Sequence, residues 1–406
     1  MIRFIMTDLG ILYYVGTYPM LSESFIINEI HELKKRGHNV AVFALAKSNE
    51  SITHEKHRKI DIPTYYGEIS YSDFHQLASR KILNMTFNSP RHVFKSSFSI
   101  KRVLHTLLLG KKCSDFIEKL DFEIDVIHGH FAKETRLGEI HAAKYHDKPC
   151  VVTAHAVEIF KELDNRQIKE ICDAMNQVIV PTRYNKQYLR NQVGIQNSIS
   201  VIPATTEVDK FKYNGCKINN RILTVGRLVE KKGYKYAINS IERLVSNGYD
   251  LEYHIIGDGE DKQKLRNQIN EYGIQDNVSI LGNVSDERLR SEFNEANIFV
   301  LPCVVAKDGD RDAMPVVLKE AMASRTACIS TTISGIPELI TNEDNGILVP
   351  PRNTNALTEA IEDLLTNPDK VDQISKKGQE TVEEQFDISD SVDLLVNVFK
   401  NISNNN

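Results

Sequence analysis

Short apolar runs alternate along the whole chain with stretches in which apolar residues recur at helical spacing. Ile11–Val15 is a short run rich in β-branched and aromatic residues, which predicts a strand. Asn39–Leu45 is the next such run, and Gly37 stands just before it. Between the two runs, apolar residues recur at helical spacing and predict one helix face, formed by Ile26, Ile30 and Leu33. Strands that alternate with helices predict a parallel sheet covered by helices on both faces.

The same alternation begins again in the second half of the chain. A polar stretch after Val201–Pro203 predicts a domain boundary near residue 205. The strands predicted beyond it are Arg221–Val225, Leu251–Ile256, Val278–Leu281, Ile298–Leu301 and Ala327–Ser330. We therefore predict an α/β protein with two doubly wound, Rossmann-like domains at residues 1–205 and 206–385. A helix within 386–406, with its apolar face in Ser389–Ile402, is expected to pack back on the N-terminal domain.

Composition excludes some classes of function. The 406 residues are 41% hydrophobic and 26% charged, as is ordinary for soluble α/β proteins. The net charge of −5 argues against nucleic acid as the main partner, because phosphate binding usually needs a basic surplus. No apolar run approaches the roughly 20 residues of a membrane span. Asp8 interrupts the apolar start Met1–Gly16 and the cysteines are scattered, so we expect a cytoplasmic protein with reduced thiols.

Candidate binding residues follow the predicted strands of the second half, where open α/β sheets bind their ligands. Arg227 and Lys232 share the loop after Arg221–Val225. A guanidinium and an ammonium on one loop suit the oxygens of a diphosphate, although solvated surface charges explain either residue alone. Gly257, after the next strand, either lets the backbone approach a ligand closely or forms a simple tight turn.

The loop after Ile298–Leu301 is the strongest candidate. It contains Asp312, Ala313, Met314, Pro315 and Val316, and it leads into a helix that carries Glu320. Pro315 suits the first helical turn, so we expect this segment to direct free amides at an anion. Asp312 and Glu320 are at most about 12 Å apart along a helix, which allows one to lie near a sugar and the other near a ribose. A helix-capping aspartate with a surface glutamate is the simpler interpretation.

The first half offers fewer candidates. Gly16 begins a loop expected from Gly16 to Ser22, and His155 follows the strand Val151–Ala154. A histidine in that position either donates to a sugar hydroxyl or to developing negative charge, or serves the structure alone. His128 and His130 add a polar edge, but the sequence offers no third ligand for a metal site.

These segments together resemble the retaining GT-B glycosyltransferases of family GT4, and most of all their colanic acid and exopolysaccharide branch. Residues 22–30 read S-E-S-F-I-I-N-E-I, similar to the S-E-T-F-I-x-N-E opening of that branch. Residues 226–233 contain G-R-L and K-K-G, similar to another motif of the branch. Each motif is weak alone, but their order along nearly the whole chain is specific.

The resemblance implies two Rossmann-like domains that face a central cleft. It also implies a role for each candidate residue. Arg227 and Lys232 are expected at the donor diphosphate, Asp312 at the donor sugar and Glu320 at the ribose. His155 is expected beside the transferred sugar, and Gly16 near the phosphates.

Four positions depart from the pattern of the family. Asp312 replaces the first glutamate of its E-x7-E pair, and Ala313 replaces a usual glycine. Ala156 replaces a common glycine after the histidine, and Glu158 stands where aspartate is frequent. These departures bear on catalytic efficiency rather than on the fold.

The resemblance predicts a retaining hexosyltransferase in surface polysaccharide biosynthesis, such as that of exopolysaccharide or lipopolysaccharide. The donor is expected to be a UDP- or GDP-sugar, and the acceptor a saccharide or a polyprenyl-linked saccharide. Arg227, Lys232 and helix amides are expected to stabilise the leaving diphosphate, so we predict that no metal or other cofactor is needed. A nucleotide-sugar epimerase and a nucleotide-sugar-binding subunit with weak catalysis are the alternatives.

A basic segment extends over residues 74–114, which contain no aspartate or glutamate. Its basic residues are Arg80, Lys81, Arg91, Lys95, Lys101, Arg102, Lys111 and Lys112. A basic segment that also contains leucine and phenylalanine fits an anionic membrane surface, at the inner face of the cell membrane. A basic surface that is simply solvated explains the segment equally well.

Overall fold

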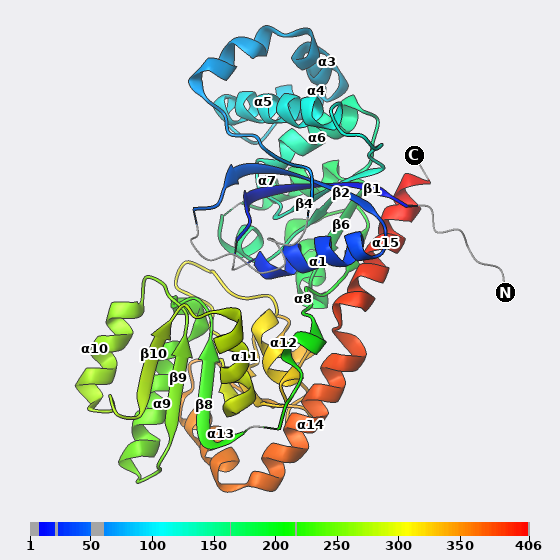
Figure 1. The fold of residues 1–406 in the computed structure, drawn as a ribbon. Coiled ribbons are helices and arrows are strands. Elements are labelled where there is room, and N and C mark those ends of the chain that lie inside the picture. Colours follow the sequence, from blue (N-terminus) through cyan, green and yellow to red (C-terminus); the bar gives the residue numbers. More distant parts are fainter. Residues whose placement is uncertain (1–7, 21–22, 50–60, 163, 216, 405–406) are drawn as a thin grey trace, which may run out of the picture. The chain divides into compact units, whose positions relative to one another are not determined.

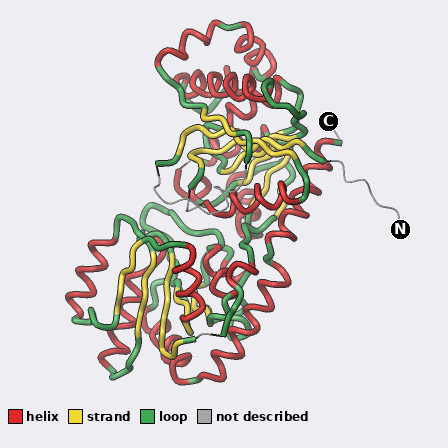
Figure 2. Tube along the Cα trace, viewed as in Figure 1, coloured by secondary structure: helices red, strands yellow, loops and turns green. Residues whose placement is uncertain are grey.

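The computed structural model describes residues 8–20, 23–49, 61–162, 164–215 and 217–404. Ser22 of the predicted motif and Cys216 lie outside these ranges. The chain divides into two compact units, of which the first comprises Met1–Pro203 with Ser391–Asn406 and the second comprises Ala204–Asp390. Each unit contains a β-sheet enclosed by helices, as the alternation of apolar runs and helical stretches predicts (Figure 2).

The sheet of the first unit has the strand order β3-β2-β1-β4-β5-β6-β7, and its described pairings are all parallel. The strands are β1 Gly10–Tyr18, β2 Asn39–Lys47, β3 Thr64–Tyr66, β4 Val126–His130, β5 Cys150–Thr153, β6 Gln177–Val180 and β7 Ile199–Val201. Gly16 was expected in a loop, and that prediction is wrong. Strand β1 continues to Tyr18 because its parallel pairing with β2 continues, with Thr17 opposite Ala46.

Helices cover this sheet, and one group of them forms a separate layer. The helices of the unit are α1 Ser24–Lys35, α3 Arg80–Asn88, α4 Pro90–Phe94, α5 Ile100–Ile117, α6 Arg136–Tyr145, α7 Asn165–Ala174, α8 Arg183–Tyr188 and, from Ser391 onward, α15 Ile388–Ser403. Helix α6 packs beneath α3 and α5, so the basic segment belongs to this helical layer (Figure 1). Short 3-10 or π turns complete the unit at η2 Tyr71–Ala78, η3 Glu158–Glu162 and η4 Leu189–Val193.

Helix α15 joins the first unit although it comes last in the sequence. Its Phe399 ring lies 5.2 Å from the ring of His128, measured between centroids. Ser403 Oγ donates a hydrogen bond to the Asp125 carbonyl over 3.2 Å, and Asp393 pairs with Arg36 at the end of α1. The apolar face predicted for the closing segment is buried, at Val392, Leu395 and Phe399.

The sheet of the second unit has the order β10-β9-β8-β11-β12-β13, again with parallel pairings throughout its described strands. Its strands are β8 Ile218–Val225, β9 Glu252–Ile256, β10 Val278–Gly282, β11 Ala296–Val300, β12 Ala327–Thr331 and β13 Ile347–Val349. The predicted strands of this half are confirmed within two or three residues at their ends. The short strand β13 was not predicted.

Alternate residues of these strands face opposite helical layers. Ile222 and Ile298 pack with α9 Tyr234–Ser246, α10 Lys262–Tyr272 and α13 Thr354–Thr366. Their neighbours Leu223 and Phe299 pack with α11 Asp286–Glu295, α12 Val316–Ala323 and the end of α14 Pro368–Gln385. The remaining turns are η5 Val208–Phe211, η6 Glu230–Lys232 and η7 Ile336–Glu338. Because helices cover both faces of this sheet, the carboxyl ends of its strands are followed by loops.

Among the described residues, no helix is long and apolar enough to cross a membrane. The cysteines that the structure describes are all free and buried: Cys113, Cys150, Cys172, Cys303 and Cys328.

Candidate functional site

The loop after β8 is held in place by backbone contacts that require glycine. Gly233 has φ of 72°, and a Cβ there would lie 1.9 Å from the Pro302 carbonyl oxygen. The Val304 amide donates to the Lys231 carbonyl over 2.8 Å. The loop that carries the two predicted cations is therefore fixed against the segment that follows β11.

Lys232 meets Asp312 at this junction. Lys232 Nζ lies 2.8 Å from Asp312 Oδ2, and Lys231 Nζ lies 3.4 Å from Asp312 Oδ1 and 3.0 Å from Asp310 Oδ1. Cys303 Sγ lies 3.6 Å from Asp312 Oδ2. Two residues proposed from separate motifs thus form one cluster of charges at the carboxyl edge of the sheet, and Lys231 joins them.

The partly buried charges of this cluster stabilise one another. Burial raises the pKa of the Asp312 carboxyl, but the charges of Lys232 and Lys231 lower it by more, so it lies well below its usual range. Burial lowers the pKa of Lys232, but Asp312 and Cys303 together raise it by more, so it lies above its usual value. Both residues are therefore charged at neutral pH. The exposed Arg227 adds a positive charge that acts on Lys232.

Gly257 is required by packing between two loops. Its φ is 135°, and a Cβ there would lie 2.0 Å from the Gly226 carbonyl oxygen. The Leu228 amide also donates to the Asp258 carbonyl over 2.9 Å, so the loops after β8 and β9 are bound together. Gly257 thereby sets the position of the loop that carries Arg227.

The segment before α12 differs from the prediction at one residue. Helix α12 begins at Val316, and Pro315 is its N-cap with extended ψ of 126° rather than a residue of the first turn. The prediction for Pro315 is therefore wrong by one position, since its backbone has not yet entered the helix. Asp312 is not the helix cap, which rules out the simpler interpretation of that residue.

The residues around Asp312 are fixed by the next loop. Ala313 and Met314 are buried, and the Gly335 amide donates to the Ala313 carbonyl over 2.8 Å. Beside Gly335, Ser334 has φ of 49°, and its buried Oγ has no hydrogen-bond partner in the described part of the chain. Glu320 is half-buried on α12, where its charge acts on the adjacent Lys319. The loops after β8, β11 and β12 therefore converge around Asp312.

In the first unit, His155 lies at the end of a row of histidines. Its Nε2 is 3.2 Å from His130 Nδ1, and its ring centroid is 4.9 Å from that of Phe25. Glu158 Oε1 accepts the His155 amide over 2.6 Å and the Ala132 amide over 3.0 Å, which fixes the loop after β5. Burial and the neighbouring His130 hold the pKa of His155 well below its usual range, so the imidazole is neutral at neutral pH.

Glu29 of α1 reaches the same row. Its Oε1 lies 3.4 Å from His128 Nδ1 and 3.4 Å from His130 Nε2, and the Tyr13 hydroxyl donates to it over 2.5 Å. The sequence offered no third ligand beside His128 and His130, but the structure provides one. Gly16, on β1, has no described atom within 4 Å of a Cβ added there, so local packing does not require glycine.

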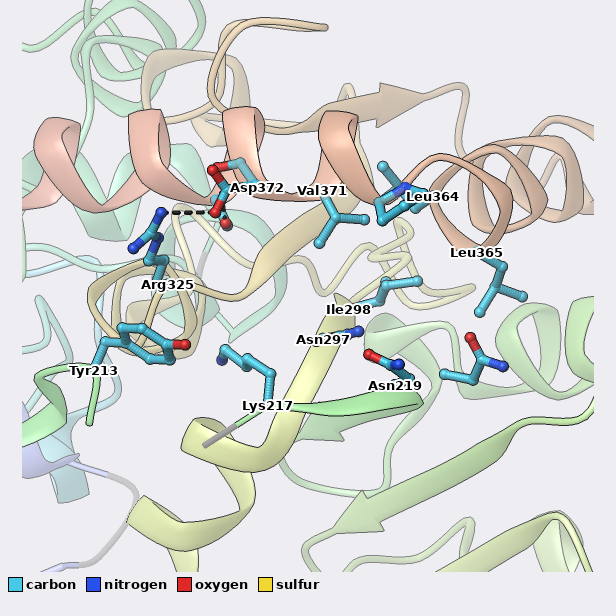
Figure 3. A pocket seen from close by; sticks show the side chains of 13 residues that line it. Tyr213, Lys217, Asn219, Asn297, Ile298, Arg325, Leu364, Leu365, Val371 and Asp372 are labelled. Atoms are coloured by element: carbon cyan, nitrogen blue, oxygen red, sulfur yellow. Dashed lines mark hydrogen bonds and ion pairs between the residues drawn. The ribbon is translucent and has the colours of Figure 1, made fainter. Parts of the chain in front are cut away.

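A pocket of about 400 Å³ lies elsewhere in the second unit (Figure 3). Asn219 at the start of β8 and Asn297 at the start of β11 line it, and Arg325 pairs with Asp372 at its rim. It opens at the amino ends of the strands, whereas Lys232 and Asp312 follow the carboxyl ends. We therefore place the candidate site at the charge cluster and not at this pocket.

Three charged residues of these clusters, Lys231, Asp310 and Glu29, were not predicted as site residues. The sequence could have indicated Lys231, because it stands beside Lys232 in the same loop. Glu29 belongs to the quoted motif of residues 22–30, but nothing in the sequence places α1 against the end of β4. His155 and Gly16 belong to the first unit, while the other predicted site residues belong to the second.

Models of two protein families match consecutive parts of the chain. The model described as Glycosyltransferase Family 4 matches residues 22–210, and the model described as Glycosyl transferases group 1 matches residues 205–381. The chain belongs to glycosyltransferase family 4. This confirms the family and the enzyme class that the sequence motifs predict.

Relatives of this glycosyltransferase match it over most of its length. WcaL of Escherichia coli, named as a colanic acid biosynthesis glycosyltransferase, is 26% identical over 396 residues and aligns with 92% of this chain and 95% of its own. The amylovoran biosynthesis glycosyltransferase AmsK of Erwinia amylovora is 26% identical over 395 residues, with the same coverage.

Solved structures share the fold of this glycosyltransferase. The structure of HepE of Anabaena in complex with UDP-glucose superposes with a TM-score of 0.74 at 17% identity, over 96% of this chain and 99% of that one. A glycosyltransferase from Rickettsia africae superposes with a TM-score of 0.73, also at 17% identity, over 98% and 100%. The predicted fold class, with two Rossmann-like sheets, is confirmed.

Proposed function

We propose that this glycosyltransferase transfers a hexose from a UDP- or GDP-sugar to a saccharide or polyprenyl-linked saccharide in exopolysaccharide biosynthesis, with retention of anomeric configuration. The observation that carries the donor proposal is the Lys232–Asp312 pair at the carboxyl edge of the second sheet. The names of WcaL and AmsK support the assignment to polysaccharide biosynthesis. Retention rests on the family resemblance.

The charge balance of the cluster favours an anionic ligand. Lys231 and Lys232 pair with the carboxylates of Asp310 and Asp312, and the exposed Arg227 lies on the same loop outside these pairs. Arg227 is therefore a cation of this loop that a diphosphate reaches without displacing Asp310 or Asp312. A diphosphate that reaches Lys232 gains an ammonium donor that is already desolvated, and such charge-assisted hydrogen bonds are the strong ones.

We assign the other residues by the family pattern and by their surroundings. Asp312 contacts the donor sugar, Glu320 the ribose, and the backbone of residues 313–316 the phosphates, beside the unpartnered Ser334 hydroxyl. Gly257 supports the loop of Arg227. Because cations already lie at this cluster, we propose that the diphosphate leaves without a metal ion at its oxygens.

In the first unit we propose that His155 lies beside the transferred sugar and that Gly16 leaves room for the phosphates. The neutral imidazole of His155 suits a hydrogen bond to a sugar hydroxyl through Nδ1, because its Nε2 already lies 3.2 Å from His130 Nδ1. The absence of any packing requirement at Gly16 fits a residue kept small for a ligand.

Calorimetric titration with UDP, GDP, ADP and their sugar conjugates in EDTA tests the donor proposal. We expect one nucleotide class to bind the wild type and Lys232→Ala to weaken that binding at least about tenfold, or about 1.4 kcal/mol. Lys262→Ala is the matched control, since this lysine pairs with Asp258 at the surface of the same unit. Equal affinities for wild type and Lys232→Ala would contradict the proposal.

Product analysis separates transfer from the two alternative activities. A nucleotide-sugar epimerase changes the sugar of the donor when no acceptor is present. A binding subunit binds the donor but gives no product with any acceptor. Transfer to a polyprenyl-linked saccharide with the donor anomer retained is the result we expect, and sugar exchange with donor alone would favour the epimerase.

We further propose that the helical layer of the first unit docks on an anionic membrane surface. Most of the large apolar side chains that are exposed in the described chain gather here: Tyr71, Phe74, Leu83, Phe87, Phe94 and Ile100. Exposed cations lie among them at Arg80, Arg91, Lys95 and Lys101. By contrast Lys81, Lys111 and Lys112 pair with carboxylates of the same layer, so only part of the basic segment serves this surface.

A further inference from the structure

Two histidines and a glutamate converge at the carboxyl end of β4. His128 and His130 are two positions apart on that strand, so their side chains leave the same face of the sheet. Glu29 reaches them from α1. His128 Nδ1, His130 Nε2 and a carboxylate oxygen of Glu29 all lie within 4.8 Å of one another.

The Glu29 carboxylate interacts with both histidines, but the two inner nitrogens lack well-aligned hydrogen bonds to the described part of the chain. His128 Nδ1 and His130 Nε2 have no hydrogen-bond partner among the described residues, although the two side chains are 0% and 1% exposed. Each buried polar atom left in this way costs about 1–3 kcal/mol. Both nitrogens nevertheless lie 3.4 Å from the same oxygen, Glu29 Oε1.

The two nitrogen-to-oxygen distances of 3.4 Å are those that a zinc ion imposes on a pair of its ligands. With bond lengths of about 2.0–2.1 Å, two ligand atoms of a tetrahedral zinc ion are about 3.3–3.4 Å apart. Two histidines with one glutamate are a ligand set that zinc takes in enzymes, with the fourth position open to water or substrate.

The second ring nitrogen of each histidine has a polar partner, as is usual for histidines in metal sites. His128 Nε2 lies 2.8 Å from Thr153 Oγ1, and His130 Nδ1 lies 3.2 Å from His155 Nε2. Proteins usually hold a metal-bound histidine through its second nitrogen in this way. If the outer nitrogens carry the protons, both inner nitrogens present lone pairs toward Glu29. The Tyr13 hydroxyl holds the carboxylate in turn.

We propose that Glu29, His128 and His130 bind one divalent transition-metal ion, with zinc as the best match. The site belongs to the first unit, whereas the cations proposed for the diphosphate belong to the second, so metal-free departure of the diphosphate is a separate claim. The bound ion fixes His130 as a donor to His155. His155 then accepts at Nε2 and keeps its own proton at Nδ1.

Cobalt titration of the full chain after chelator treatment tests the site. We expect one equivalent of Co²⁺ to give the visible absorption of a four-coordinate ion, and Zn²⁺ to displace it. Glu29→Gln keeps the shape of the side chain but removes the anionic ligand, so we expect it to lose the absorption at the cobalt concentration that saturates the wild type. Thr153→Val leaves the ligands in place, and we expect affinity to fall about tenfold to a hundredfold.

His254→Asn is the matched control. His254 pairs with Glu292 over 2.7 Å in the second unit, and no described residue adds a third ligand there, so this variant should bind Co²⁺ like the wild type. Nucleotide binding in EDTA checks that each variant is folded and tests the donor site independently. Absence of stoichiometric cobalt or zinc binding by the wild type, or equal binding by Glu29→Gln, would overturn the proposal.

Discussion

Lys232 Nζ lies 2.8 Å from Asp312 Oδ2, and this contact joins the loop after β8 to the loop after β11. Lys232 is 11% and Asp312 15% exposed at the side chain, so neither charge is fully hydrated. The two residues therefore depend on each other when no ligand is present. A diphosphate must compete with Asp312 for the ammonium group, which makes the pair a sensitive test of the site.

Asp312→Asn should separate stability from ligand binding. Removing one partner of a fully buried pair costs about 3–5 kcal/mol, and we expect about 2–3 kcal/mol here because both side chains keep some exposure. Nucleotide affinity should instead rise, on the order of tenfold, because the competing carboxylate is gone. Urea unfolding and calorimetry measure the two effects.

Asp258→Asn is the control for that substitution, because Asp258 pairs with Lys262 in an exposed position. It should change the free energy of unfolding by less than about 1 kcal/mol. If Asp312→Asn lowers stability no more than this control, the pair does not hold the two loops together. If it also weakens nucleotide binding, Asp312 does not compete with the phosphates.

Gly257→Ala should destabilise the second unit and weaken nucleotide binding together. The new Cβ would lie 2.0 Å from the Gly226 carbonyl oxygen, so the loop that carries Arg227 must move. Gly248→Ala is the control, because Gly248 also has positive φ, 90°, but no described atom lies within 4 Å of a Cβ added there. We expect the control to cost about 1–2 kcal/mol from backbone strain alone, and Gly257→Ala to cost more. Equal losses of unfolding free energy would show that the close contact is unimportant.

The fold could be predicted from sequence because its signals are local. A run such as Ile11–Val15 predicts its own strand, and the apolar face that follows it predicts its own helix. The repeated alternation of strand and helix then predicts a parallel sheet. The signal failed at Gly16, where pairing with β2 extends β1 beyond the apolar run. It also failed for β13, whose three residues are too few for a period to show.

The candidate site was less predictable, because its contacts join distant segments. The order of strands places the loops of Lys232 and Asp312 at one edge, and that much follows from a parallel sheet. The direct ion pair, and the addition of Lys231, depend on the turn at Gly233. Glu29 could not be joined to His128 by any local rule, since the packing of α1 determines that contact.

The first unit should lose stability as the pH falls below 6.5. Burial lowers the pKa of His141 to about 3 and that of His92 to about 4. The unfolded chain binds protons at these residues near pH 6.5 while the folded chain does not, so the free energy of unfolding falls with pH from 6.5 toward 4. Each histidine contributes a slope of up to about 1.4 kcal/mol per pH unit.

His141→Asn tests the histidine contribution. Asparagine does not titrate, and its amide can keep the contact that His141 Nδ1 makes with Ser89 Oγ over 2.6 Å. We expect a shallower dependence of the unfolding free energy on pH between 4.5 and 6.5. His75→Asn, at an exposed position, should leave the slope unchanged. A slope that is the same in all three proteins would assign the acid sensitivity to other groups.

The helical layer of the first unit should bind vesicles that contain anionic lipid. Phe87 and Phe94 are 78% and 75% exposed, so Phe87→Ser with Phe94→Ser removes apolar contact with little effect on the core. Arg91→Glu with Lys95→Glu should weaken flotation more than tenfold, since each basic residue near an anionic surface contributes about 1 kcal/mol. Tyr272→Ser, at an exposed aromatic of the second unit, should float like the wild type. Flotation that does not depend on anionic lipid, or no flotation at all, would leave the layer as a solvated face.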